Sequence, residues 1–369
     1  MSYTYNDATM AIAAQIAYLD FDDPSIGNGG NQNIGDLVDL YLTKYGDYKD
    51  GVWELNPNKI KSKRDEELFK IASSIIEMST SEGGSEDWRN WNVVDVCNDQ
   101  NNTGYYGILI ETGDGNAIIS NRGSEKTDFS TGWKDWAEAD FGMLDNELTA
   151  QQKKSQAYME KIWSKYGEKY DSFSVTGHSL GGNLAQHMTI TAPAAMRDKL
   201  DHCISFDGPG FSDEYIKAHQ KDIEKVSNKI DHYKWSIVSS LLNVLPGVNP
   251  KVIQAQESFF KRHSMYNIEF NENGEVQESD RTLEALIAGP ISVIIESLPS
   301  ENTTLVMLPT AVETLIGLKM VVKAITKFRE IGQKVKSLMQ NIYYNHIAPQ
   351  VSGTYEVNKI SVSNLSDEI

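Results

Sequence analysis

Cysteine is scarce in this sequence, basic residues are outnumbered, and long apolar runs are missing. The 369 residues include two cysteines, Cys97 and Cys203, too few for a disulfide framework or a cysteine zinc site. The histidines are scattered and no H-E-x-x-H motif occurs, so we expect neither a metal nor a cofactor. With 34 Lys and Arg against 52 Asp and Glu, the net charge is −18. This charge repels phosphate backbones, so nucleic acid is not an expected partner.

The sequence also predicts no segment that directs a chain into or across a membrane. The first residues contain no basic stretch followed by an apolar core, so no secretory signal peptide is predicted. The most apolar stretch, near 283–326, is interrupted by charged residues before it reaches the ~18–20 apolar residues that a spanning helix needs. We therefore expect a protein that is cytoplasmic, or exported by a route without a cleavable signal.

The remaining composition is that of a globular protein, with 40% apolar and 23% charged residues. Periodicity and turn residues predict helices over 7–19, 35–45, 63–79, 147–167 and 182–198, and strands over 105–111, 116–120, 172–176 and 202–206. Strands that alternate with helices indicate an α/β fold with parallel central strands. We divide the chain into a main domain over 1–282, a helical C-terminal appendage over 283–345 and a polar tail over 346–369.

One motif carries the chemistry. The segment Gly177-His-Ser-Leu-Gly181 matches G-x-S-x-G between a predicted strand and a predicted helix, which is the context of a nucleophile elbow. The tight turn forces a strained backbone on Ser179, and glycines at 177 and 181 remove Cβ atoms that would clash. The following helix start, with the Leu180 N–H, favours developing negative charge. The motif predicts Ser179 as the nucleophile of an α/β-hydrolase fold.

A serine nucleophile needs a base, which in this fold follows it in the chain order Ser, Asp or Glu, His. Three histidines lie far enough downstream: His232, His263 and His346. His232 falls within an expected strand, and His346 belongs to the C-terminal helical region. His263 lies in a loop just before a hairpin predicted near 267–276, from which a side chain can reach the elbow. We predict His263 as the base and keep His346 in reserve.

Two aspartates are candidates for the acid that orients the base. Asp207 follows the strand after the elbow and therefore emerges at the same carboxyl edge of the sheet as Ser179. Asp231 lies near the start of a strand expected to continue to Val238, which places it toward the opposite edge. We predict Asp207 as the acid, with Asp231 as the alternative.

An oxyanion hole is expected just beyond the strand over 116–120. The segment Asn121-Arg-Gly-Ser124 places the Ser124 N–H where it can pair with that of Leu180. Together with Trp133-Lys-Asp-Trp136 and the elbow, this segment resembles the class 3 lipases in order and spacing.

A bacterial branch of that group is more similar still, on two further segments. These are Ala17-Tyr-Leu-Asp-Phe21 and Phe206-Asp-Gly-Pro-Gly-Phe211, and the resemblance covers roughly residues 10–280. Class 3 lipases usually carry the acid after the next strand, where this sequence has Ser236.

The resemblance implies a serine carboxylic-ester hydrolase that acts on lipids, as a phospholipase A or lipase, through a Ser-His-Asp triad and an acyl-enzyme. Phospholipid ranks before neutral glyceride as the expected substrate, with transient contact at a membrane or lipid-aggregate surface. The alternative is a catalytically silent binding module of the same fold, which presents its C-terminal helices to a partner protein.

Overall fold

The computed structural model describes residues 4–21, 32–80, 84, 87–123, 149–236, 238–240, 242–255 and 263–280. The chain divides after Ile287 into two units, and all described residues belong to the first. The predicted appendage over 283–345 and the tail over 346–369 lie outside the described residues. The boundary between 282 and 283 therefore stays a prediction.

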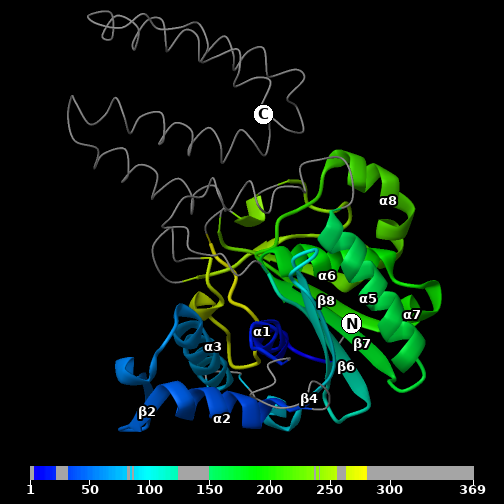
Figure 1. Ribbon diagram of the computed structural model, residues 1–369. Helices are drawn as coiled ribbons and strands as arrows, with labels where there is room; N and C mark the ends of the chain where they lie inside the picture. Colours follow the sequence, from blue (N-terminus) through cyan, green and yellow to red (C-terminus); the bar gives the residue numbers. More distant parts are fainter. Residues whose placement is uncertain are drawn as a thin grey trace, which may run out of the picture. The chain divides into compact units, whose positions relative to one another are not determined.

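A mostly parallel sheet forms the centre of the described part (Figure 1). Its strands, in spatial order, are β1 (Gln32–Asn33), β4 (Asn92–Asp99), β5 (Tyr105–Glu111), β6 (Asn116–Asn121), β7 (Ser172–His178), β8 (Leu200–Phe206), β9 (Ile230–Lys234) and β10 (Lys251–Val252). The pairs from β1 to β6 are antiparallel, and the pairs from β6 to β10 are parallel. A separate hairpin joins β2 (Gly46–Lys49) and β3 (Val52–Leu55).

Helices cover both faces of this sheet (Figure 1). One face carries α1 (Asp7–Ile16), α2 (Ile34–Tyr45) and α3 (Lys63–Thr80), and the other carries α5 (Ala150–Tyr166), α6 (Leu180–Thr191), α7 (Ala194–Lys199) and α8 (Asp213–Val226). Short 3₁₀ helices lie at Pro57–Lys59, Asp87–Asn90, Ser227–Lys229, Val238–Ser240 and Met265–Asn267.

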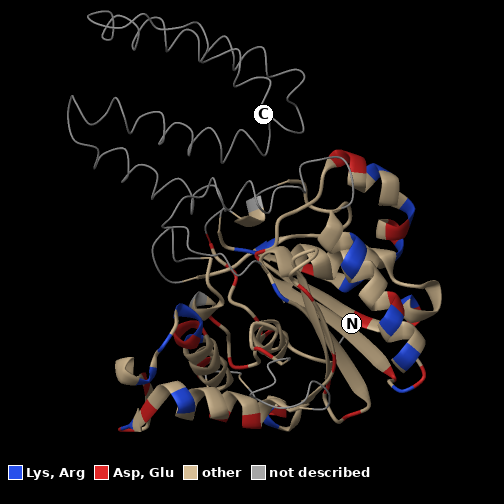
Figure 2. Cartoon of the chain, in the orientation of Figure 1, with Lys and Arg blue, Asp and Glu red and all other residues tan. Residues whose placement is uncertain are grey.

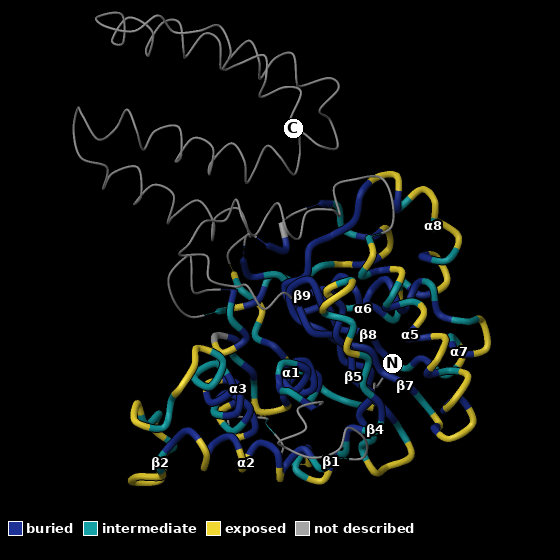
Figure 3. Tube along the Cα trace, in the orientation of Figure 1, coloured by how far each residue is buried: buried dark blue, intermediate teal, exposed yellow. Residues whose placement is uncertain are grey.

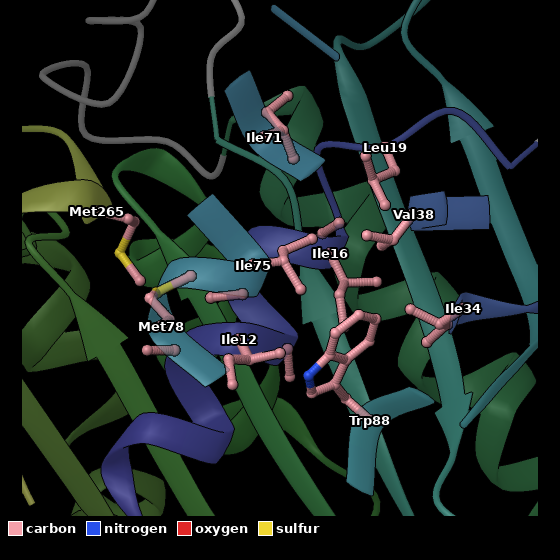
Figure 4. Packing of buried hydrophobic residues seen from close by; sticks show 14 of the residues in the cluster. Ile12, Ile16, Leu19, Ile34, Val38, Ile71, Ile75, Met78, Trp88 and Met265 are labelled. Carbon is pink, nitrogen blue, oxygen red and sulfur yellow. The ribbon is translucent and has the colours of Figure 1, made fainter. Parts of the chain in front are cut away.

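Alternation along the strands produces two hydrophobic cores. On β5, Ile108 and Ile110 belong to the core under α1, α2 and α3, whereas Leu109 between them belongs to the core under α5 and α6. Figure 4 shows the first core, where Ile12 and Ile16 of α1 pack among residues of α2 and α3. The central strands are buried along most of their length (Figure 3). This three-layer arrangement is the predicted α/β-hydrolase fold.

Most predicted elements are present, with two corrections. The helix expected over 182–198 is divided into α6 and α7, because Pro193 lacks an N–H and holds Ala192 in an extended conformation. The strand expected to reach Val238 ends at Lys234. This earlier end places Ser236 beyond the strand, in the segment that follows β9.

The outer surface is polar and carries both signs of charge. Figure 2 shows Lys and Arg interspersed with Asp and Glu on the outer helices, while the central strands carry few charges. Within the described ranges, no helix combines the length and apolar character required to cross a bilayer.

Candidate active site

The elbow is formed by a single residue between a strand and a helix. β7 ends at His178 and α6 begins at Leu180, and Ser179 between them has φ 59° and ψ −133°. A side chain with a Cβ rarely adopts this backbone region. A Cβ on Gly177 would collide with the Gly181 carbonyl, and one on Gly181 would collide with that of Asn121. The packing around the turn therefore requires both glycines of the motif.

Asp207 lies at the end of the neighbouring parallel strand. β8 ends at Phe206, and Asp207 is fully buried with φ 51°. Its Oδ1 accepts hydrogen bonds from the N–H groups of Trp235 and Ser236, each at 3.0 Å. Burial opposes ionisation, but the hydrogen bond and charge of His263 outweigh it and hold the pKa of Asp207 below its ordinary value. The buried carboxyl is therefore a carboxylate at neutral pH.

His263 contacts this carboxylate directly. Its Nδ1 lies 2.6 Å from Oδ2 of Asp207, and its ring lies 4.5 Å, centroid to centroid, from that of His178. His178 immediately precedes Ser179, so the imidazole of His263 lies beside the elbow. The Ser179 hydroxyl is buried and makes no hydrogen bond to any described residue. The structure thus joins Asp207 to His263 and places both near Ser179, without a hydrogen bond from the serine.

The alternative acid Asp231 and the histidine His232 have other hydrogen-bond partners. Asp231 is the second residue of β9, and its Oδ2 lies 2.7 Å from Nε2 of His202, at the end of the sheet where β8 and β9 begin. His232 uses Nε2 to donate to the carbonyl of Gly208, which holds the turn after Asp207. His346 lies outside the described residues.

The predicted oxyanion hole is described on one side only. Leu180 is the first residue of α6, so its N–H is one of the amides that a helix leaves without an internal partner. Ser124 lies outside the described residues, as do Trp133 and Trp136. The Gly123 N–H donates to the Tyr18 hydroxyl at 3.1 Å and is thereby occupied.

Gly123 also packs against the nucleophile. A Cβ added there would meet the Tyr18 hydroxyl oxygen and the His178 carbonyl oxygen at 2.5 Å each, and the Ser179 Cβ at 3.0 Å. The Arg-Gly-Ser segment therefore lies in contact with the elbow, and only glycine fits at its centre.

A series of hydrogen bonds next to the elbow was not predicted from the sequence. Burial lowers the pKa of His178 to about 3, so its imidazole is neutral. Nε2 lies 2.8 Å from the His263 carbonyl and must carry the proton, because a carbonyl only accepts. Nδ1 is then an acceptor and receives the hydrogen bond of the Tyr18 hydroxyl, at 3.1 Å. The segment Ala17-Tyr-Leu-Asp-Phe21 contributed to the family resemblance, but its sequence did not indicate that Tyr18 contacts His178.

Arg122 holds the segment that carries Tyr18. The guanidinium is buried, lies 3.7 Å above the Tyr106 ring, and donates from Nε to the Ala17 carbonyl at 2.6 Å and from Nη2 to that of Leu19 at 2.5 Å. The arginine before Gly123 thus fixes the chain on both sides of Tyr18.

In the part of the chain that the structure describes, no group of His, Cys, Asp or Glu is arranged to hold a metal ion.

Comparisons with known proteins add a family and several distant structures. A family model described as Mbeg1-like matches residues 86–307, a range that contains Ser179, Asp207 and His263. The M37 lipase structure shares 15% identity over 65% of this chain and 71% of that chain, with a TM-score of 0.37. For a mono- and diacylglycerol lipase from Aspergillus oryzae the identity is 12%, over 77% of this chain and 90% of that chain, with a TM-score of 0.33. No curated protein matches the chain.

Proposed function

The chain belongs to the Mbeg1-like family, and from the geometry of its site we propose that it is a serine carboxylic-ester hydrolase that acts on lipids. The observation that carries this proposal is the buried hydrogen bond of 2.6 Å between Asp207 and His263 beside Ser179. A buried carboxylate that holds an imidazole next to a serine on a strained turn is the arrangement that nucleophilic acyl transfer requires.

In the proposed reaction, the Ser179 hydroxyl attacks the acyl carbonyl while Nε2 of His263 accepts its proton. The proton then passes to the leaving alcohol, and an acyl-enzyme remains. His263 next removes a proton from a water molecule, whose oxygen attacks the acyl carbon. As the bond from the acyl carbon to Oγ of Ser179 breaks, His263 returns that proton to Oγ, and the carboxylic acid is released. Asp207 holds Nδ1 of His263 and stabilises the imidazolium, and the amides of Leu180 and Ser124 bind the oxyanion.

Phospholipid is the proposed substrate class, with neutral glyceride next. This choice follows the sequence resemblance to class 3 lipases. Ser179 is fully buried. A long acyl substrate therefore reaches the Ser179 hydroxyl only if the protein segments around it move aside. Small activated reagents therefore belong in the same test as lipids.

The test compares the wild type with Ser179→Ala on p-nitrophenyl esters and labelled phospholipids. We expect turnover by the wild type and background rates for the variant. Ser174→Ala is the matched control, because Ser174 is a buried serine within β7 and lies away from the turn. A fluorophosphonate should label the wild type and Ser174→Ala but not Ser179→Ala. Equal, near-background turnover by all three would refute the proposal and favour a silent binding module.

The base is tested in the same assays. His263→Ala should lower kcat by about 10³-fold or more, because no other described imidazole contacts Asp207, whereas His346→Ala should change it only a few-fold. The reverse result would assign the base to the C-terminal region and contradict the role of His263.

A further inference from the structure

The turn that follows Asp207 is held by buried side chains from two other elements. Asp207 has φ 51°, a backbone region that a residue with a Cβ keeps only where its surroundings hold it. Each of the next three carbonyls, those of residues 208–210, accepts a hydrogen bond from a side chain. The first accepts Nε2 of His232 at 2.9 Å, and the second and third accept Nδ2 of Asn183 at 3.3 and 2.8 Å.

Asn183 belongs to the helix of the elbow, so its amide connects the acid's turn with the nucleophile's helix. It is the fourth residue of α6 and is fully buried. The turn lies directly on this helix, because a Cβ added to Gly208 would come within 2.9 Å of the Asn183 backbone nitrogen and 3.0 Å of the Gly182 carbonyl carbon. The Asn183 side chain therefore bridges two backbone segments that are already in contact.

Gln152 of α5 determines which way the Asn183 amide points. Carbonyls only accept hydrogen bonds, so Nδ2 of Asn183 must face the turn and Oδ1 must face away from it. Oδ1 accepts Nε2 of Gln152 at 3.0 Å, and Oε1 of Gln152 accepts the N–H of Thr149 at 3.1 Å. This last bond is half of the capping box at the start of α5. Backbone groups at both ends thus fix the direction of the two amides between them.

We propose that Asn183 is a positioning residue that holds the turn carrying Asp207, and that Gln152 sets the direction of its amide. The start of α5 thereby determines how Asp207 faces His263. The described hydrogen bonds of both amides end on backbone groups or on each other, so both act through the turn. The effect on activity rests on the proposed function, whereas the effect on the contact between Asp207 and His263 does not.

Carboxyl groups of the same shape test this inference. Asn183→Asp and Gln152→Glu each replace an NH₂ donor by a carboxyl oxygen, which donates only while it carries a proton. Burial raises the pKa of a carboxyl group, so the introduced group should supply the donor at low pH and lose it on ionisation at higher pH. His187, which lies against the Gln152 backbone, has a pKa that burial lowers to about 3, so it stays neutral between pH 5 and 8.

Two readouts are used, of which one does not need catalysis. At pH 8 each variant should have a kcat about 10- to 100-fold below the wild type at nearly unchanged KM. The ratio of kcat between variant and wild type should then rise at least about fivefold from pH 8 to pH 5. The downfield proton resonance of the hydrogen bond between His263 and Asp207 should be present in the wild type at pH 8 and shifted or lost in both variants.

Gln186→Glu is the matched control for a buried carboxyl group. Gln186 is also buried on α6, but its amide makes no hydrogen bond to any described residue. Gln186→Glu should lose unfolding free energy as the pH rises, while its kcat per folded molecule and the resonance stay those of the wild type. The same kinetic change in Gln186→Glu as in Asn183→Asp would overturn the inference.

Neutral substitutions keep the inference testable if the acidic variants fail to fold. Gln152→Met removes the donor without adding charge and should lower kcat by about 3- to 10-fold. Gln156→Met, one turn later on α5, removes only a bond to Glu160 and should not. The inference is overturned if these two variants behave alike, or if folded acidic variants keep the resonance and a pH-independent kcat ratio. A shifted resonance in a protein that never turns over esters would support the inference while refuting the proposed function.

Discussion

The hydroxyl of Tyr18 lies 3.1 Å from the backbone nitrogen of Gly123 and 3.1 Å from Nδ1 of His178. The other ring nitrogen of His178, Nε2, donates a hydrogen bond to the carbonyl of His263. The N-terminal segment, the Arg-Gly-Ser segment, the elbow and the loop of the proposed base are thus joined by three consecutive hydrogen bonds. A neutral His178 is required, because its Nε2 must donate while its Nδ1 accepts. The N-terminal segment is therefore part of the support of the site.

Removal of the Tyr18 hydroxyl should disconnect this chain. We expect Tyr18→Phe to lower kcat/KM by about 5- to 100-fold, because it leaves buried partners at Gly123 and His178 unsatisfied. The measurement is ester hydrolysis per folded molecule. Tyr5→Phe is the control, since its hydroxyl bonds Thr112 and Asp114 outside the site and its loss should leave kcat/KM nearly unchanged. Equal effects of the two substitutions would contradict the supporting role of Tyr18.

Gly123→Ala should shift the residues around the proposed nucleophile. Its Cβ would press on the Tyr18 hydroxyl, the His178 carbonyl and the Ser179 side chain, so we expect activity to fall by about 100-fold or more. Gly167→Ala creates a comparable clash with Trp163 at the end of α5. Both variants should lose about 1–3 kcal/mol of unfolding free energy, measured by urea denaturation. Only Gly123→Ala should also lose activity, and retained activity in this variant would contradict the close packing of Gly123 on the nucleophile.

Neutralising the acid distinguishes the two aspartates. Asp207→Asn should lower kcat by about 10²- to 10⁴-fold with folding retained, since asparagine tolerates a positive φ but supplies no charge to an imidazolium. Asp231→Asn should change kcat little, because its described partner is His202. Steady-state kinetics together with thermal unfolding would decide between them. A larger kinetic loss in Asp231→Asn at unchanged stability would show that Asp207 is wrongly assigned.

Buried neutral histidines should make the protein sensitive to acid. Burial, with a smaller contribution from the charge of His219, lowers the pKa of His187 to about 3. Between about pH 6.5 and 3 the unfolded chain binds a proton at this position that the folded chain does not, so the unfolding free energy falls as the pH falls. His187→Gln should reduce this slope by about 1.4 kcal/mol per pH unit. Urea denaturation at several pH values measures both slopes, and parallel slopes would contradict the buried neutral state.

Local features of the site were readable from the sequence because they depend on neighbours in the chain. The G-x-S-x-G spacing, with strand periodicity before it and helical periodicity after it, was sufficient to predict the turn at Ser179. Strand β4 was missed, since Asp95 interrupts its apolar alternation. The fold compensates for this buried carboxylate with Lys161 at 2.6 Å and Lys165 at 3.2 Å, both from α5. These ion pairs join residues far apart in the chain, so the sequence around Asp95 contains no pattern that predicts them.

Longer-range relationships were decided by the tertiary structure. The sequence by itself determined the nucleophile candidate, the α/β alternation and a short set of acids and bases that included Asp207, Asp231 and His263. The sheet decided how they are paired: strand order and the early end of β9 bring Asp207 and Ser236 to His263, 56 and 27 residues away in the chain. A hydrogen bond acts over about 3 Å. Residues so far apart in the chain meet at that distance only through the pairing and register of strands, which no local pattern records.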